Sequence, residues 1–122
     1  MNKLFICLYL FSFCLISCHH VDSNAVTGAR EFCEEMALYE APKDYVKANE
    51  CLERYWKAYS ESDQLEVFCM ALLDEFKTQK YNHIATFIGN TDRVKYPLFL
   101  EFMKYFIAVN EARMINDLNN AK

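Results

Sequence analysis

The chain has 122 residues, of which 13 are basic and 17 are acidic, so its formal net charge is −4 at pH 7. The chain is net acidic and its Lys and Arg residues form no cluster. This charge distribution excludes nucleic acid and anionic lipid headgroups as electrostatic partners. The length allows one domain, and 53% hydrophobic residues are enough for a buried core.

The first residues are typical of an export signal. Lys3 precedes an uncharged stretch from Leu4 to Ile16, and the small residue Ser17 follows. As a helix this stretch would measure about 20 Å, which is too short for a bilayer core of ~30 Å. A basic start, a short apolar stretch and a small residue at its end predict a cleaved signal peptide.

Residues Leu15-Ile16-Ser17-Cys18 resemble the lipobox of bacterial lipoproteins, in which a branched apolar residue, a tolerant position and a small residue precede a cysteine. The resemblance implies that the Cys18 thiol receives a diacylglycerol, that residues 1–17 are removed, and that the new amino group is acylated. Two or three acyl chains anchor a protein stably, whereas one chain binds reversibly. The alternative is an ordinary secreted protein with a chance cysteine at this junction.

The lipobox resemblance implies a protein of the bacterial cell envelope, attached to a membrane through its lipid. His19 follows Cys18 in place of the aspartate associated with inner-membrane retention in some Gram-negative bacteria, which favours the outer membrane. We expect residues 18–24 to form a tether and residues 25–122 to form a helical domain. Removal of residues 1–17 takes away Lys3, so the net charge of the mature chain is one unit more negative than that of the full chain.

Apolar side chains recur with a helical period throughout the domain. A first helix is expected from Ala25 to Tyr39, and a second from Pro42 to about Ser60. Proline suits a first helical turn because its missing N–H needs no partner there.

A third helix is expected to begin near Leu65 and to fade at Lys80. Glu66 has capping-box spacing from Asp63, and Ser62 is an equally plausible N-cap.

A short fourth helix is expected from Tyr81 to Ile88, before Gly89, and a long last helix from Pro97 to about Leu118. The first half of that last helix is apolar on nearly all sides, which predicts a central helix packed by neighbours all round. Short loops between the first helices predict an all-α fold, a small antiparallel bundle of about four to five helices.

Three further cysteines, Cys33, Cys51 and Cys69, are spaced 18 residues apart and lie on or beside the apolar faces of the first three helices. In antiparallel helices they would stand at one height. An exported protein meets an oxidising environment, so Cys33–Cys51 or Cys51–Cys69 could form a disulfide. The alternative is three buried thiols that act as small apolar fillers. No metal site is predicted, because no C-x-x-C occurs and His83 is not at ligand spacing from the cysteines.

An aromatic cluster, formed by Tyr45, Tyr55, Trp56 and Tyr59, is a candidate surface for a sugar or a protein partner, because Tyr and Trp combine apolar area with a polar tip. The alternative is that these side chains fill the core.

The second expected helix is similar to the second helix of a tetratricopeptide unit, with Tyr45, Ala48, Leu52 and Tyr55 at matching positions. Phe32 and Tyr39 match the first helix of such a unit. Met36 is larger than the pattern requires, and no closing proline follows Tyr59. The resemblance implies helix-pair packing and peptide or protein binding, with no particular ligand.

Catalytic motifs such as G-x-S-x-G and H-E-x-x-H are absent from the sequence, so we expect no enzyme and no cofactor beyond the lipid. The function predicted first is a lipid-anchored binding or scaffolding module that meets a protein or glycan in the envelope. One alternative is an immunity-type inhibitor of a basic toxin or enzyme. Another is a metal or redox carrier that uses His19, His20 and a free thiol.

Overall fold

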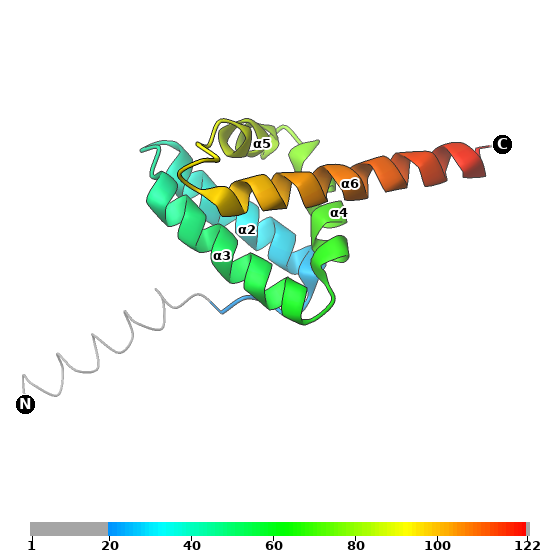
Figure 1. Cartoon of the computed structure of the whole chain (residues 1–122), viewed down its shortest axis with the longest axis horizontal. Helices are drawn as coiled ribbons and strands as arrows, with labels where there is room; N and C mark the ends of the chain where they lie inside the picture. The colour runs from blue at the N-terminus through cyan, green and yellow to red at the C-terminus, as the bar shows by residue number, and fades with distance from the viewer. Residues whose placement is uncertain (1–19, 122) are drawn as a thin grey trace, which may run out of the picture.

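The computed structural model describes residues 20–121, which form five helices and, within that range, no strand. The helices are α2 (Ala25–Glu40), α3 (Tyr45–Glu61), α4 (Leu65–Phe76), α5 (Asn82–Gly89) and α6 (Pro97–Asn120). In Figure 1, α2 and α3 run side by side in opposite directions, and α6 crosses the domain and extends beyond it. The predicted all-α bundle is therefore confirmed. Within residues 20–121, no helix combines the length and apolar character that a membrane span needs.

The turns after α2 and α3 end these helices in the same way. Lys43 (φ 53°) and Asp63 (φ 60°) both adopt the left-handed conformation. The N–H of the residue after each donates to the carbonyl of Tyr39 or Tyr59, at 2.9 Å in both cases. This is the Schellman arrangement, in which glycine usually takes the left-handed position. A side chain in that position costs roughly 1–2 kcal/mol.

Ser62 and Asp63 close α3 and do not cap α4, so the predicted cap of the third helix is wrong. The Ser62 hydroxyl donates to the carbonyl of Ala58 at 2.9 Å. The N-cap position of α4 is taken by Gln64, whose side chain makes no capping hydrogen bond. Ser62 and Asp63 lie between the end of α3 and the start of α4, so they could cap either helix. Because Asp63 adopts the left-handed conformation, both residues belong to the end of α3.

Side chains cap the first turns of α2 and α3. The Asn24 side chain accepts hydrogen bonds from two N–H groups of the first turn of α2, at 3.0 and 3.1 Å. Asp44 caps α3, so Pro42 lies in the preceding turn and not in the helix where it was expected. The helix α4, predicted as the third helix, ends at Phe76. This is about one turn before Lys80, where the helix was predicted to end.

The core is built around α2, which packs against α3, α4 and α5. The Phe32 ring lies at its centre and meets Tyr55 and Phe68 edge-on, with centroids 5.3 and 5.5 Å apart. Edge-on aromatic pairs stabilise a core beyond the area that they bury. The largest fully buried side chains come from all five helices: Tyr59, Phe32, Phe68, Phe99, Phe102, Met36, Leu52, Leu72 and Ile84.

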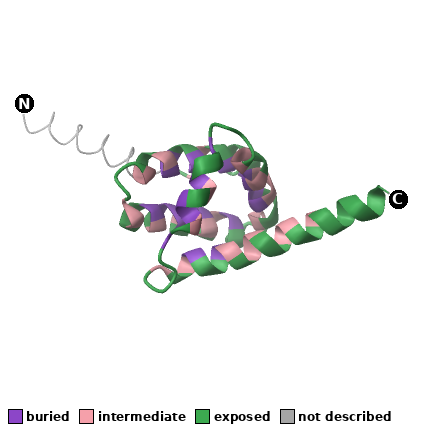
Figure 2. Cartoon of the chain, turned by 90° about the horizontal axis from the view of Figure 1, so that it is seen from above, coloured by how far each residue is buried: buried purple, intermediate pink, exposed green. Residues whose placement is uncertain are grey.

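The last helix, α6, is not the central helix that its composition predicts. Its buried residues are Phe99 and Phe102, and it lies against α3 and α4 on one side of the domain. Figure 2 shows that the end of this helix is exposed on every side, and the exposed part runs from Met114 to Asn120. The central position belongs to α2, so the prediction of a central last helix is wrong.

Candidate interaction surface

Aromatic side chains hold the first half of α6 against the domain. The Phe102 and Phe106 rings stack with centroids 5.7 Å apart, and Phe106 also meets Phe76 of α4 at 5.7 Å. On the α3 side, Tyr105 meets the Trp56 ring edge-on at 6.1 Å. These contacts fix the rotation of α6 about its own axis.

The second half of α6 leaves the domain after Arg113, which donates a hydrogen bond to Asp74 of α4 at 3.2 Å. Every residue from Met114 to Ala121 is exposed. Three of them are large and apolar, and Met114, Ile115 and Leu118 are 57%, 60% and 64% exposed. Figure 1 shows this part of α6 projecting from the rest of the molecule.

One face of α6 carries a regular series of six side chains, all of them exposed. Its four apolar members, in chain order, are 37%, 50%, 57% and 64% exposed. The series repeats at spacings of four and three residues, which is the repeat of a coiled-coil seam. We call this series the α6 stripe: Leu100, Lys104, Ile107, Glu111, Met114 and Leu118.

An apolar groove of about 180 Å³ runs beside the α6 stripe, between α5 and α6. Ile107 belongs to both the stripe and the groove, and Gly89 lines the opposite wall. A Cβ at Gly89 would meet nothing within 4 Å, so the groove is open there. Single exposed apolar residues are normal, whereas a regular series of them beside a groove is a candidate binding surface. The sequence did not indicate this surface, because the first half of the helix was predicted to be buried all round.

The aromatic cluster predicted from the sequence lies mostly in the core. Tyr55 and Tyr59 are 3% and 1% exposed. Tyr45 is half-buried and stacks on Phe87 with centroids 5.1 Å apart. Trp56 is half-buried against α6. Of the four candidates, Tyr45 and Trp56 offer surface to a partner.

Tyr59 holds the start of the domain in place. Its hydroxyl donates to the carbonyl of Asp22 at 2.8 Å, and its ring crosses α2 at Gly28. Burial, with the nearby charges of Asp22 and Glu31, raises the pKa of Tyr59 to about 12. The Tyr59 hydroxyl therefore stays protonated and the hydrogen bond to the tether persists at ordinary pH.

The candidate cysteines divide into two groups. Cys18 lies outside the described residues. Cys33, Cys51 and Cys69 are free and buried, an arrangement that corresponds to apolar fillers. Burial raises the pKa of Cys33 and Cys69 to about 12, and it raises the pKa of Cys51 as well. Thiols in this state are poor nucleophiles and poor metal ligands.

A partly buried ion pair joins α2 to α3 and was not predicted. Arg54 donates two hydrogen bonds to the Glu35 carboxylate, and the Tyr39 hydroxyl donates a third at 2.8 Å. Burial alone would raise the pKa of Glu35, but the hydrogen bonds and the positive charge of Arg54 outweigh it and hold the pKa below its usual value. In the sequence, the signal for this ion pair was that Glu35 lies between Phe32 and Met36, on the face of α2 that is buried.

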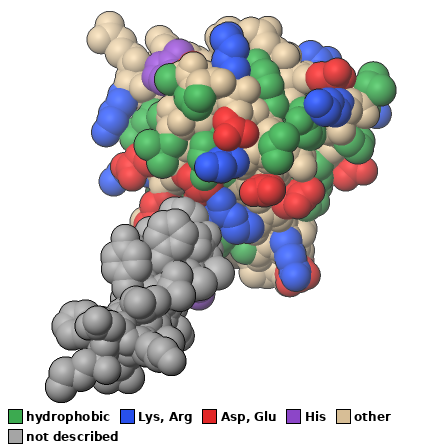
Figure 3. Space-filling view, turned by 90° about the vertical axis from the view of Figure 1, so that its left-hand side faces the viewer, with side chains coloured by type: hydrophobic (Ala, Val, Ile, Leu, Met, Phe, Trp, Pro, Cys, Tyr) green, Lys and Arg blue, Asp and Glu red, His purple; other side chains and the backbone are tan. Residues whose placement is uncertain are grey.

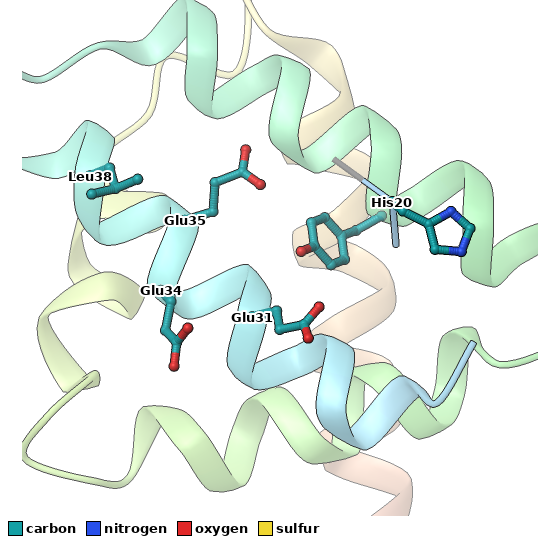
Figure 4. A pocket seen from close by; sticks show the side chains of 6 residues that line it. His20, Glu31, Glu34, Glu35 and Leu38 are labelled. Atoms are coloured by element: carbon teal, nitrogen blue, oxygen red, sulfur yellow. The ribbon is translucent and has the colours of Figure 1, made fainter. Parts of the chain in front are cut away.

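Glu35 also lines a hollow between α2 and α3 (Figure 4). The hollow is acidic, because Glu31 and Glu34 line it too, and the exposed His20 lies at its edge. Within residues 20–121, no three His, Cys, Asp or Glu side chains are placed to hold a metal ion. His19 lies outside the described residues. On the face shown in Figure 3, acidic and basic side chains are intermingled.

Neither the family models nor the curated proteins nor the solved structures give a match to this chain. Its function is therefore argued from its own surface.

Proposed function

We propose that this protein is a lipid-anchored envelope module that binds a protein partner through α6. The observation that carries the proposal is the α6 stripe. It is an exposed seam on a helix that extends beyond its own domain. Burying such a seam against a partner helix is the usual way for a projecting amphipathic helix to be stabilised.

The energetic argument follows from the exposed apolar side chains. Burying a Leu, Ile or Met side chain fully contributes about 1.5–3 kcal/mol. The four apolar members of the stripe remain 37–64% exposed in the free domain, so a partner that covers them gains part of that amount at each position. This gain must exceed the free-energy cost of association. Complementary charges then select the partner.

The lipid anchor rests on the lipobox resemblance at residues 15–18. It is tested by growing cells with a labelled fatty acid and comparing the wild type with Cys18→Ala. We expect label on the wild type, and an uncut, unlabelled precursor for the variant. A normally processed Cys18→Ala protein would refute the anchor.

The binding surface is tested by photo-crosslinking the intact protein in its native membrane. The variant Ile107→Lys/Met114→Lys places two charges within the α6 stripe. Val94→Lys is the control, because Val94 is 93% exposed and lies in the loop before α6. We expect the control to keep its crosslinked partners and the stripe variant to lose them. Equal crosslinking of both variants would refute binding through α6.

Neutralisation of a basic toxin is the second candidate function, supported by the acidic hollow at Glu31 and Glu34. The variant Glu31→Lys/Glu34→Lys should then abolish growth protection against a neighbouring strain and leave crosslinking through α6 unchanged. Protection that survives this variant would remove the second candidate. No observation on the described residues favours the metal or redox carrier.

A further inference from the structure

We infer that the partner of the α6 stripe is a second copy of this chain, whose α6 binds in the antiparallel direction. The inference rests on the proposed function for the choice of surface and adds the identity of the partner. It is carried by the two charged members of the stripe, which have opposite signs.

Lys104 and Glu111 lie seven residues apart, or about 10 Å along the helix axis, too far to pair with each other. Both side chains are exposed and both lie within the seam, where a partner would cover them. A parallel second copy would place Lys104 against Lys104 and Glu111 against Glu111. Like charges in a seam oppose association and exclude that orientation.

An antiparallel copy reverses this relationship. It brings Lys104 of one chain beside Glu111 of the other, and two-fold symmetry repeats the pair. The same register sets Leu100 of one chain against Met114 of the other and places the two Ile107 side chains on either side of the axis. The charged pairs thus fix the direction and register, while the apolar positions supply the buried area.

The shape of the monomer accommodates this pairing. The six side chains of the stripe are all exposed, so a second helix can reach them without displacing the buried Phe99 and Phe102. The projecting half of each α6 would cover the first half of the other. Ile107 of the second copy would then lie beside Ile107 of the first, at the edge of the apolar groove.

The test uses two full-length chains with different tags, co-expressed in the native membrane. One carries Leu100→Cys and the other Met114→Cys, and copper phenanthroline is added to oxidise neighbouring thiols. We expect a disulfide-linked dimer that carries both tags. Either variant alone should give none, because in this register its introduced cysteines would lie about 21 Å apart and a disulfide needs Cα atoms within about 7 Å. The wild type is the control for native cysteines.

Charge exchange in the two cysteine chains checks the assignment of the partner residues. Lys104→Glu alone and Glu111→Lys alone should each abolish the mixed dimer, because each creates two like-charged contacts. The combined exchange Lys104→Glu/Glu111→Lys should restore it. A parallel dimer would not follow this pattern.

Three other outcomes would each overturn the inference, and they can be told apart. Crosslinking of Leu100→Cys with itself would show a parallel dimer. Capture of a different protein at Met114→Cys, without a self-dimer, would overturn the second copy as partner and leave the proposed function standing. Absence of both would overturn the inference and the binding surface together, while fatty-acid labelling still reports on the anchor.

Discussion

Replacing Gly28 with alanine should destabilise the protein, although alanine is the better helix former by about 1 kcal/mol. Gly28 is buried in α2, directly under the Tyr59 ring. A Cβ at this position would lie 1.6 Å from the Tyr59 hydroxyl oxygen, 2.7 Å from Cζ and 3.2 Å from Cε2. Contacts this short are not possible, so the Tyr59 ring must move.

The size of the effect follows from what confines that ring. Tyr59 is 1% exposed, and its ring packs against Phe68 with centroids 4.8 Å apart. Overpacking of this kind costs about 1–3 kcal/mol. Displacement also breaks the hydrogen bond to Asp22, which contributes ~1 kcal/mol. After subtracting the helix preference of alanine, we expect a net loss of about 1–3 kcal/mol in the free energy of unfolding.

The assay is urea denaturation of the purified full chain, followed by far-UV circular dichroism. Gly89→Ala is the control, because a Cβ there meets nothing within 4 Å and the change should not destabilise. Tyr59→Phe removes the closest atom, so Gly28→Ala should cost less in that background than in the wild type. An equal cost in both backgrounds, or a Gly28→Ala protein as stable as Gly89→Ala, would refute the assigned contact.

Three further predictions concern the turn after α2, the thiols and the ion pair. Lys43→Gly should stabilise the protein by about 0.5–1 kcal/mol in the same assay, because glycine adopts the left-handed conformation without strain; a loss of stability would contradict the Schellman turn. The thiols of Cys33, Cys51 and Cys69 should resist a maleimide at neutral pH in the folded protein and react in urea, as counted by mass spectrometry; equal labelling in both states would contradict their burial. Glu35→Gln should cost about 2 kcal/mol at neutral pH, because it leaves a half-buried arginine without its carboxylate. Because the pKa of Glu35 is lowered in the folded state, the wild type begins to lose this advantage as the pH falls below about 4.3, the pKa of glutamate in an unfolded chain, and loses it fully only below the folded-state pKa. Urea titrations of both proteins should converge in that more acidic range.

The helices could be predicted from the sequence because their signals are local. Apolar residues with a helical period identify α2, α3 and α4, and Pro97 marks the first turn of α6. Helix ends were less predictable where two signals compete. Ser62 and Asp63 satisfy the spacing for a cap of the next helix, yet a left-handed residue at Asp63 lets the chain close the previous helix first.

The position of α6 could not be predicted because composition shows what a helix is able to bury and not what covers it. Residues such as Leu100 and Ile107 read as core in a sequence, and the structure leaves them 37% and 50% exposed. For Tyr55 and Tyr59 the sequence left both a partner surface and the core open, and the structure buries both residues. Neither position could be decided from the sequence, because neighbours distant in sequence determine which apolar faces are covered.

The hydrogen bond from Tyr59 to Asp22 would link the proposed anchor to the proposed pairing of chains. If Cys18 carries the lipid, the segment from Cys18 to Asp22 reaches at most about 14 Å, at ~3.5 Å per residue. The domain would then stay close to the bilayer, and chains on one membrane would meet at a high effective concentration. At such a concentration a seam as short as the α6 stripe would suffice to hold two copies together. The anchored chain in its membrane is for this reason the sample in which an α6 pair should be sought, and Gly28→Ala, which displaces Tyr59 and frees the tether, should weaken the pair without altering the stripe.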